Sequence, residues 1–377
     1  MTEKYKILVV GGGRPSLSTE AFLSKFLNIV YDISKDIHLV SESFPCEFNG
    51  RIRWIKPRNI INNPTKLKFK IINHIFVQIY ITLAIFKLAI KNKYKVCIFY
   101  NVLILPMLFS KLMRIKIIKY HGGSYYKLRF VTERNFLIRV ILVTIFEVLP
   151  SMVSNMIIIE SKSCQEFQKL ENYKHKIVIA PLYVDTNNFY PRRKIKSRQY
   201  IIGYVGNIDE NKGVTELCRA FILLDKFIKA KNIKINIIGT GPLLDYISNI
   251  ITSSSISEYV NFIGWVSHAS LPHYLNELKL LILPSNSEGL PNIILESMAC
   301  GTPVLATPVG AIPDVIKDNV TGFILQNNSA ACIAENIIKI MNYPDLDIIS
   351  DNALALIHKN FTYESSYKRY SEILDCF

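Results

Sequence analysis

The sequence lacks the cysteine patterns of a disulfide-bonded or zinc-binding protein. Its seven cysteines are odd in number, and none forms a Cys-x-x-Cys pair or has a histidine at a nearby ligand spacing. These absences argue against a disulfide framework and against a structural zinc site. They fit a reducing cytoplasm, where we expect most of the cysteines to fill small spaces in a core.

Acidic residues are scarce relative to basic ones. The 377 residues include 45 Lys and Arg against 30 Asp and Glu, a formal net charge of +15. This excess favours anionic partners such as nucleotide phosphates or acidic lipid headgroups. Nucleic acid is not expected as a partner, because the sequence has no zinc-finger spacing, no aromatic RNA-binding signature and no recognition-helix pattern.

An uninterrupted membrane-spanning run is also missing. The apolar stretch at residues 71–90 approaches the required length, but it contains five polar interruptions: Asn73, His74, Gln78, Thr82 and Lys87. We interpret it as a buried or membrane-facing helix of a soluble domain. The first six residues lead directly into an apolar strand at 7–10, which leaves no room for a signal peptide, so no export is expected.

The chain does contain two successive cycles of apolar strands and helix-length segments, and its length suits two domains. The alternation predicts parallel sheets wound with helices, an α/β protein of two Rossmann-like domains that face each other across a cleft. Helices are predicted at 19–27, with Ser18 as a cap, and at 214–230. The predicted strands are 7–10, 37–40, 96–100, 115–120 and 156–159, then 201–206, 233–238, 260–263, 280–283 and 303–306.

The densest chemical signal lies at residues 283–304. A strand ends near the start of this segment, a polar loop reaches Gly289, and a helix is predicted from about Pro291. The amino terminus of such a helix presents free backbone N–H groups and a positive dipole end, which suit a diphosphate. Glu288 stands just outside the helix and Glu296 about two turns inside it, where carboxylates can hydrogen-bond sugar and ribose hydroxyls. Alternatively, Glu288 caps the helix and Glu296 is a solvated helix residue.

Residues 287–316, SEGLPNIILESMACGTPVLATPVGAIPDVI, resemble the E-x7-E signature of family 4 of the GT-B retaining glycosyltransferases. The resemblance implies transfer of a sugar from a UDP- or GDP-linked donor with its anomeric configuration retained. It also implies that Glu296 binds the ribose hydroxyls of the nucleotide and that Glu288 contacts hydroxyls of the transferred sugar. Backbone groups of the residues that follow would touch the sugar and the phosphates: Gly289, Leu290, Pro291 and Asn292.

The loop at residues 206–213 resembles the one with which this family grips the donor diphosphate through an Arg and a Lys. Lys212 matches the Lys, and its ammonium can act as a point charge on phosphate; an exposed loop lysine is the alternative. Asn207 stands where the family often has the Arg, so a bidentate phosphate clamp is lost. Either the donor is held more weakly or another basic residue substitutes.

Four further positions resemble elements of the family's reaction centre. Gly239 and Gly241 form a glycine turn after a predicted strand, near the expected base and ribose. His121 ends a strand before two glycines and resembles the family's His-Gly motif, whose histidine lies against the sugar; a structural histidine is the alternative. Gly13 belongs to an amino-terminal glycine loop that approaches phosphate and acceptor, or to a plain tight turn.

The resemblance covers essentially the whole chain and sets the expected domain boundaries. We expect an acceptor-side domain at 1–182, a linker at 183–199 and a nucleotide-sugar-binding domain at 200–358, since Pro and exposed charge mark the linker. The segment 359–377 resembles the family's last helix, which crosses back onto the first domain. Leu182-Tyr183 replaces the Asn-Gly that the family has before its linker.

No metal or other cofactor is expected. Asp345 and Asp347 fit the D-x-D pattern of a different class of glycosyltransferase, but they lie in a Pro-containing stretch far from the predicted cleft. Lys212 and the helix terminus can neutralise a diphosphate in place of a cation. Retention can arise from a covalent intermediate or from same-face attack guided by the leaving phosphate. No carboxylate is obviously placed as a nucleophile, and the resemblance implies same-face attack, with domain closure excluding water.

The expected acceptor is a glycan or a lipid-linked sugar used in cell-surface polysaccharide or glycolipid assembly. Basic residues in the first domain favour peripheral binding to an anionic membrane, at the cytoplasmic face of the plasma membrane; solvated faces of buried helices are the alternative. These residues are Lys66, Lys68, Lys70, Lys87, Arg129, Arg134 and Arg139.

Two other functions remain open from the sequence. A non-catalytic nucleotide-sugar-binding protein of the same fold is favoured by Asn207. A nicotinamide-dependent enzyme using the amino-terminal glycines is disfavoured, because Ser16 occupies the last position of the expected G-x-G-x-x-G.

Overall fold

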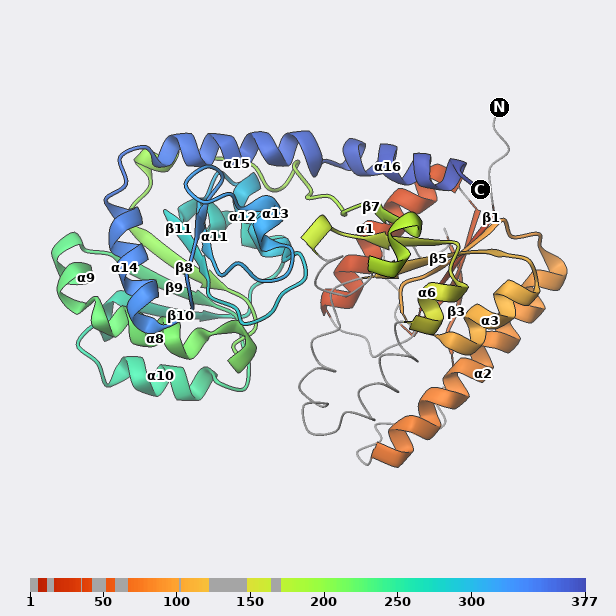
Figure 1. Ribbon diagram of the computed structural model, residues 1–377. Helices are drawn as coiled ribbons and strands as arrows, with labels where there is room; N and C mark the ends of the chain where they lie inside the picture. The colour runs from red at the N-terminus through yellow and green to blue at the C-terminus, as the bar shows by residue number, and fades with distance from the viewer. Residues whose placement is uncertain are drawn as a thin grey trace. The chain divides into compact units, whose positions relative to one another are not determined.

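Two parallel sheets, each covered by helices, belong to two compact units in the computed structural model (Figure 1). The first unit comprises Met1–Glu160, Gln168–Leu182 and Ser366–Phe377, and the second comprises Ser161–Phe167 and Tyr183–Ser365. The segment expected as a linker, 183–199, is therefore part of the second unit. The structure describes residues 6–11, 17–34, 36–42, 52–57, 67–101, 103–121, 148–163 and 171–377.

The first unit contains a seven-stranded sheet in the order β3-β2-β1-β4-β5-β6-β7, in which all neighbours are parallel. Its strands are β1 (Lys6–Val10), β2 (Asp36–Val40), β3 (Arg53–Ile55), β4 (Val96–Phe99), β5 (Lys116–His121), β6 (Met156–Ile159) and β7 (Ile177–Ile179). Its described helices are α1 (Leu17–Ser34), α2 (Leu67–Lys91), α3 (Ile104–Leu112), α6 (Leu149–Val153) and most of α16 (Tyr363–Asp375).

The second unit repeats this plan with a six-stranded parallel sheet in the order β10-β9-β8-β11-β12-β13. Its strands are β8 (Ile201–Val205), β9 (Lys234–Ile238), β10 (Val260–Gly264), β11 (Leu280–Leu283), β12 (Val304–Ala306) and β13 (Phe323–Ile324). Its helices are α8 (Val214–Leu223), α9 (Asp225–Lys231), α10 (Leu244–Thr252), α11 (Leu271–Glu277), α12 (Asn292–Ala299), α13 (Ile312–Val315), α14 (Ala330–Met341) and α15 (Leu346–Asn360).

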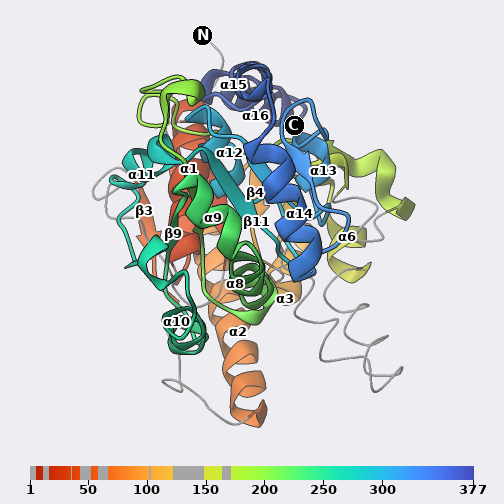
Figure 2. The ribbon, with the colours of Figure 1, turned by 90° about the vertical axis from the view of Figure 1, so that its left-hand side faces the viewer.

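Helices cover both faces of the second sheet because the chain builds the sheet from β8 outward to β10 and then crosses back to build the other half from β11 outward to β13. Right-handed crossovers that run toward β10 and toward β13 place their helices on opposite faces. Accordingly α8 packs against α10 and α14 (Figure 2), whereas α12 packs against α11 and α15. The two Rossmann-like sheets predicted from the sequence are confirmed.

Two of the predicted helices, 19–27 and 214–230, differ from the structure. The helix predicted at 214–230 is two helices, α8 and α9, which meet at Leu224, where the backbone leaves helical geometry with φ −88° and ψ 10°. Ser18, predicted to cap the first helix, lies inside α1, which starts at Leu17 and extends to Ser34.

The carboxyl-terminal helix α16 completes the first unit. Its Tyr370 is buried, donates a hydrogen bond to the carbonyl oxygen of Ala180 over 3.0 Å and packs edge-on against Phe26 of α1. Ser366 donates a second hydrogen bond to the carbonyl of Pro181. The last residues of the chain therefore lie against α1 and the segment that follows β7.

A buried arginine fixes the segment that enters the second unit. Arg198 is 5% exposed, and its guanidinium donates to carbonyl oxygens of residues distant in sequence, among them Leu278 at 2.9 Å and Cys300 at 2.6 Å, and to the hydroxyl of Thr302. Burial lowers the pKa of Arg198 to about 10, so it keeps its charge at neutral pH. Its planar fork of donors satisfies acceptors that would otherwise be buried without a partner.

Replacing Arg198 with Lys should destabilise the second unit. Lysine keeps the charge but cannot reach the same set of acceptors, so we expect a loss of roughly 2–4 kcal/mol in the free energy of unfolding. The measurement is urea denaturation in a Trp54→Phe background, where Trp265 reports on the second unit. Arg193→Lys, at an exposed neighbour, is the control and should change stability by less than about 0.5 kcal/mol. Equal free energies of unfolding for Arg198→Lys and Arg193→Lys would contradict the conclusion that the Arg198 guanidinium stabilises the second unit.

Candidate active site

The predicted donor loops meet where the strand order of the second sheet reverses. β8 lies between β9 and β11, so the loops that leave β8 and β11 start side by side and diverge to opposite faces of the sheet. Such a switch point, at the carboxyl ends of the strands, is where open parallel sheets bind ligands. Backbone contacts tie the two loops: Asn286 donates its N–H to the carbonyl of Asn211 at 2.7 Å.

A glycine allows this close approach. Gly213 has φ +67°, in the left-handed region, and a Cβ atom there would lie 2.1 Å from the carbonyl oxygen of Pro284 at the end of β11. Any other residue would have to push the two loops apart. The side chain of Asn211 adds a further bond across the same interface, donating to the carbonyl of Ser287 at 3.0 Å.

Lys212 and Glu288 form an ion pair across these loops. The Lys212 ammonium lies 2.6 Å from Oε1 of Glu288, and the hydroxyl of Ser285 donates to the same oxygen at 2.7 Å. The Glu288 side chain is 9% exposed and that of Lys212 23%. Because both contacts end on Oε1, Oε2 of Glu288 has no hydrogen-bond partner within the described part of the chain. The pair therefore combines a fixed carboxylate with an accessible ammonium.

The loop from Gly289 to Pro291 leads into the amino terminus of α12. The helix begins at Asn292, one residue later than predicted, and Pro291 is its extended N-cap. No side chain in the described residues caps it, so the proposal that Glu288 is a capping residue is wrong. The loop is held from the other side, where the N–H of Ala311 donates to the carbonyl of Gly289 at 2.9 Å. The N–H of Ile294 already donates to the carbonyl of Pro291 at 3.1 Å, so the N–H groups before it, those of Asn292 and Ile293, are the ones available to an anion.

Glu296 lies about one turn inside α12 rather than two, and it is buried, with 4% of its surface exposed. The alternative that it is a solvated helix residue is therefore wrong. Its Oε1 is 2.9 Å from Nε2 of His268, in the segment after β10, and the His268 ring lies 5.0 Å from that of Phe189. Sequence reasoning missed His268, because a spacing of 28 residues leaves no local signal of the contact.

The remaining predicted donor residues of the second unit surround the end of β8. Asn207 is exposed, donates its side-chain amide to the carboxylate of Asp209 and accepts a hydrogen bond on its carbonyl from Tyr204. Gly239 follows β9, and its N–H donates to the carbonyl of Gly264 at 2.8 Å. Gly241 packs against the loop after β8: a Cβ atom on it would lie 2.3 Å from the carbonyl oxygen of Ile208.

His121 lies in the first unit, at the carboxyl end of β5, and is 3% exposed. Burial, together with the nearby charge of Lys119, holds the pKa of His121 well below its usual range, so the imidazole is neutral at neutral pH. Gly13 and the basic residues Lys66, Arg129, Arg134 and Arg139 lie outside the described residues.

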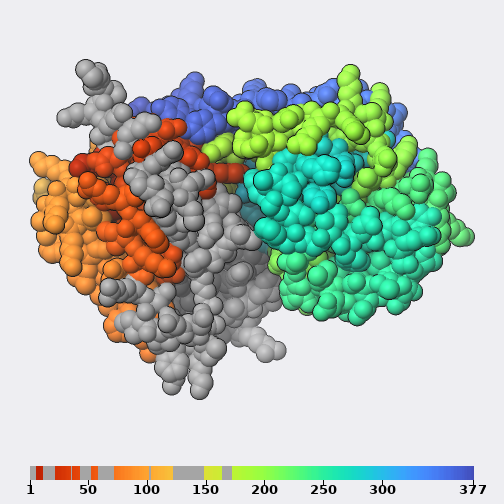
Figure 3. Space-filling view, turned by 180° about the vertical axis from the view of Figure 1, so that it is seen from behind, coloured from red at the N-terminus to blue at the C-terminus, as the bar shows by residue number. Residues whose placement is uncertain are grey.

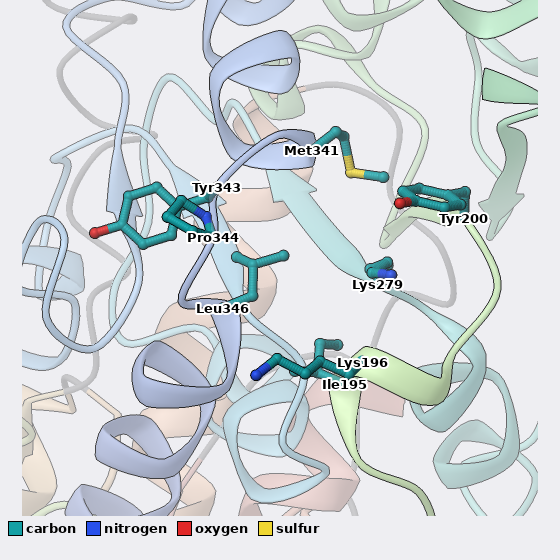
Figure 4. Close-up of a pocket in the computed structure, with 8 residues that line it drawn as sticks. All are labelled: Ile195, Lys196, Tyr200, Lys279, Met341, Tyr343, Pro344 and Leu346. Atoms are coloured by element: carbon teal, nitrogen blue, oxygen red, sulfur yellow. The ribbon is translucent and has the colours of Figure 1, made fainter. Parts of the chain in front are cut away.

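A pocket elsewhere in the second unit lies at the opposite edge of the sheet. Its volume is 230 Å³, and Tyr200 and Lys279, the residues just before β8 and β11, line it (Figure 4). The Lys279 ammonium lies 4.2 Å from the centre of the Tyr200 ring. Asp347, from the D-x-D pattern, forms an ion pair of 2.7 Å with Lys196 of this pocket. Within the described residues no group of three His, Cys, Asp or Glu side chains is arranged to hold a metal ion.

Solved structures share the two-unit architecture. HepE of Anabaena, crystallised in complex with UDP, matches with a TM-score of 0.76 over 99% of this chain and 100% of that chain, at 15% identity. The fold is GT-B. The predicted fold class is thereby confirmed.

Sequence comparison also finds similarity to glycosyltransferases, and the family model that matches lies in the second unit. Residues 185–353 match the model of the family described as glycosyl transferases group 1. An uncharacterized glycosyltransferase of Methanocaldococcus jannaschii is 26% identical over 238 residues, 59% of this chain and 60% of that protein. CapM of Staphylococcus aureus, a capsular polysaccharide biosynthesis glycosyltransferase, is 27% identical over 193 residues, 49% of this chain and 48% of that protein. The chain thus covers less than two thirds of either relative.

The lowered pKa of His121 predicts how the first unit responds to acid. In the unfolded chain a histidine titrates near 6.5, whereas the buried imidazole stays neutral to lower pH, so the unfolded state binds the proton first. The contribution of His121 to the free energy of unfolding is fully present above about pH 6.5. It falls as the pH decreases toward the folded-state pKa of His121, by up to about 1.4 kcal/mol per pH unit. His121→Asn should remove this contribution.

The measurement is urea denaturation at pH 7 and pH 5 in a Trp265→Phe background, where Trp54 reports on the first unit. His38 and His74, whose pKa values burial also lowers, are present in both proteins and cancel in the comparison. An equal loss of stability in wild type and His121→Asn would show that His121 is not held neutral.

Proposed function

We propose that the chain transfers a sugar from a UDP- or GDP-linked donor to an acceptor hydroxyl with retention of anomeric configuration, as a hexosyltransferase of glycosyltransferase family 4. The observation that carries the proposal is the ion pair of Lys212 and Glu288 at the switch point of the second sheet, beside the uncapped start of α12. The family match over 185–353 supports it, as do the HepE complexes with UDP and with UDP-glucose.

The geometry suggests how each group would meet the donor. The diphosphate would accept hydrogen bonds from backbone N–H groups between Gly289 and the first turn of α12, where the helix dipole adds positive potential. Lys212 would supply a compact positive charge. The vacant Oε2 of Glu288 can accept a hydrogen bond from a sugar hydroxyl, while its Oε1 stays held by Ser285. Glu296, oriented by His268, would bind the ribose hydroxyls.

These groups suit a reaction in which the protein positions the donor and stabilises the leaving diphosphate. In same-face attack the acceptor hydroxyl forms a bond to the anomeric carbon as the bond to the phosphate oxygen breaks, and the phosphate accepts the proton. Backbone N–H groups and Lys212 stabilise the charge that develops on the diphosphate, so no metal ion is required. His121, neutral at neutral pH, would contribute a hydrogen bond to the sugar rather than a charge.

For the acceptor we propose a glycan or a lipid-linked sugar in cell-surface polysaccharide or glycolipid assembly, at the cytoplasmic face of the membrane. The similarity to CapM supports a polysaccharide. The exposed apolar helix α2 supports a lipid-linked acceptor, since an acceptor in the membrane requires the enzyme to work at its surface.

The direct test is nucleotide release from a panel of UDP- and GDP-sugars, with the anomeric configuration of the product read by NMR. We expect one donor class to be turned over with retention. Glu296→Gln and Glu288→Gln should each lower kcat/KM by about 10²-fold or more, because each removes a hydrogen-bonding carboxylate from donor or sugar. Glu277→Gln, an exposed carboxylate that pairs with His273, is the control. Unchanged turnover in both site variants would remove the site assignment.

A non-catalytic donor-binding protein is the second candidate, because Asn207 offers the phosphates no guanidinium and its amide already pairs with Asp209. Calorimetry that shows donor binding, together with no release in the presence of acceptor extracts, would favour this candidate. An Asn207→Arg variant would then show whether the missing guanidinium limits donor affinity.

Lys212 should contribute to nucleotide affinity through its charge. We expect Lys212→Met to weaken UDP or GDP binding by about 10- to 100-fold, the value of one or two charge-assisted hydrogen bonds to phosphate. Isothermal titration calorimetry measures this directly. Lys229→Met is a matched control, because Lys229 also pairs with a carboxylate, Asp225 at 2.7 Å, but on the exposed face of α9. Equal affinities of the two variants would place the diphosphate elsewhere.

A further inference from the structure

Helix α2 has two apolar faces on opposite sides. One face belongs to the core of the first unit, where Val77, Ile81 and Ile85 pack with residues of β1 and β4. Gln78 on this side accepts a hydrogen bond from the N–H of Leu105, which ties α2 to the start of α3. These contacts account for one side of the helix and hold it against the sheet.

The other face of α2 is apolar and exposed. Its seven large side chains recur every three or four residues, which places them within about 60° of one direction around the helix. Over Ile72–Lys91 only 22% of the residues in the most apolar window are buried. The stripe is about 30 Å long at 1.5 Å per residue. Its members are Ile72, Ile75, Phe76, Ile79, Leu83, Phe86 and Ile90.

The exposed surface continues onto the neighbouring helices. α2 packs against α3, where Phe86 meets Phe109 edge-on at 5.8 Å between ring centres. Figure 3 shows part of this region, in orange, at the surface of the first unit. Exposed apolar side chains of α3, of its C-cap Met113 and of α6 extend it: Leu105, Leu108, Leu112, Met113, Leu149 and Met152. We call the exposed large apolar residues of α2, α3 and α6 the apolar ridge.

The charge along the α2 and α3 part of the apolar ridge has a single sign. From Leu67 to His121 the sequence contains ten Lys or Arg and no Asp or Glu. Lys87 and Lys91 on α2, and Lys111 and Arg114 at the end of α3, are all exposed. An apolar stripe flanked only by cations has the composition of a helix that lies in the interface of an anionic bilayer.

We propose that the apolar ridge is a membrane-docking surface and that α2 lies in the plane of an anionic lipid bilayer, with its exposed side chains among the acyl chains and its lysines at the phosphate level. The proposal deepens the proposed function, because it gives the enzyme a route to a lipid-linked acceptor. The surface itself needs no donor.

Two other arrangements of α2 fit the structure less well. As a membrane span, α2 would have to withdraw Val77, Ile81 and Ile85 from the core of the first unit. In a dimer formed through the ridge of a second copy, the cations of α2 and α3 in one copy would face the same cations in the other and repel. An anionic bilayer is complementary to both the apolar stripe and the cations that flank it.

Vesicle flotation of the full chain tests the proposal. The protein should float with vesicles that contain phosphatidylglycerol, bind phosphatidylcholine vesicles more weakly, and bind the anionic vesicles less as salt rises. Leu83→Glu should lower the partition coefficient onto anionic vesicles by about tenfold or more. Its matched control is Leu223→Glu, because Leu83 is 55% exposed and Leu223 on α8 is 64% exposed. Lys87→Glu should lower binding as well, whereas Lys226→Glu on α9 should have much less effect.

Several outcomes would overturn the proposal. One is equal flotation of Leu83→Glu and Leu223→Glu. Another is a dimer in light scattering that Leu83→Glu converts to a monomer, which would assign the ridge to a second copy. Circular dichroism and UDP calorimetry on Leu83→Glu establish that the variant is folded and that its second unit is intact. Because flotation uses no donor, its failure leaves the glycosyltransferase proposal untouched, and failure of nucleotide release leaves the docking surface untouched.

Discussion

The candidate site depends on the adjacency of β8 and β11 in a sheet whose order reverses between them. This reversal brings together two loops that are 76 residues apart in sequence and ties them through the contact of Lys212 with Glu288. If either strand were moved one place in the sheet, about 4.8 Å, the ammonium and the carboxylate could not share a hydrogen bond. The chemistry of the site is therefore a consequence of topology, and Gly213 is the residue that lets the loops close on each other.

The carboxylates of Glu288 and Glu296 lie in different surroundings and have different hydrogen-bond partners. Glu288 contacts a cation and a hydroxyl through one oxygen, which fixes the orientation of its carboxylate. Glu296 is more deeply enclosed by α12 and meets an imidazole that is 57% exposed. One carboxylate thus belongs to the loop before α12 and the other to the helix itself, so different parts of the protein orient the two groups.

Much of the fold could be predicted because the central strands are short, apolar and fully buried. The strands 156–159 and 280–283 were predicted with their observed bounds, since each is a run of four apolar residues between breaks. Three edge strands, β3, β7 and β13, were missed because they are partly exposed and only two or three residues long, whereas the five-residue edge strand β10 was predicted. Propensity alone could not show the break at Leu224, which depends on how α8 and α9 pack. Within the site, the segment 287–316 identified both glutamates, but only folding brings His268 to Glu296.

The chain path through α16 has a consequence for the order in which the protein can fold. The first unit includes Ser366–Phe377, and Tyr370 fills a buried position between α1 and the segment after β7. During synthesis the whole second unit leaves the ribosome before these residues do. The second unit is therefore synthesised before the first unit is complete, and Phe26 and the carbonyl of Ala180 lack their contacts with Tyr370 until α16 emerges.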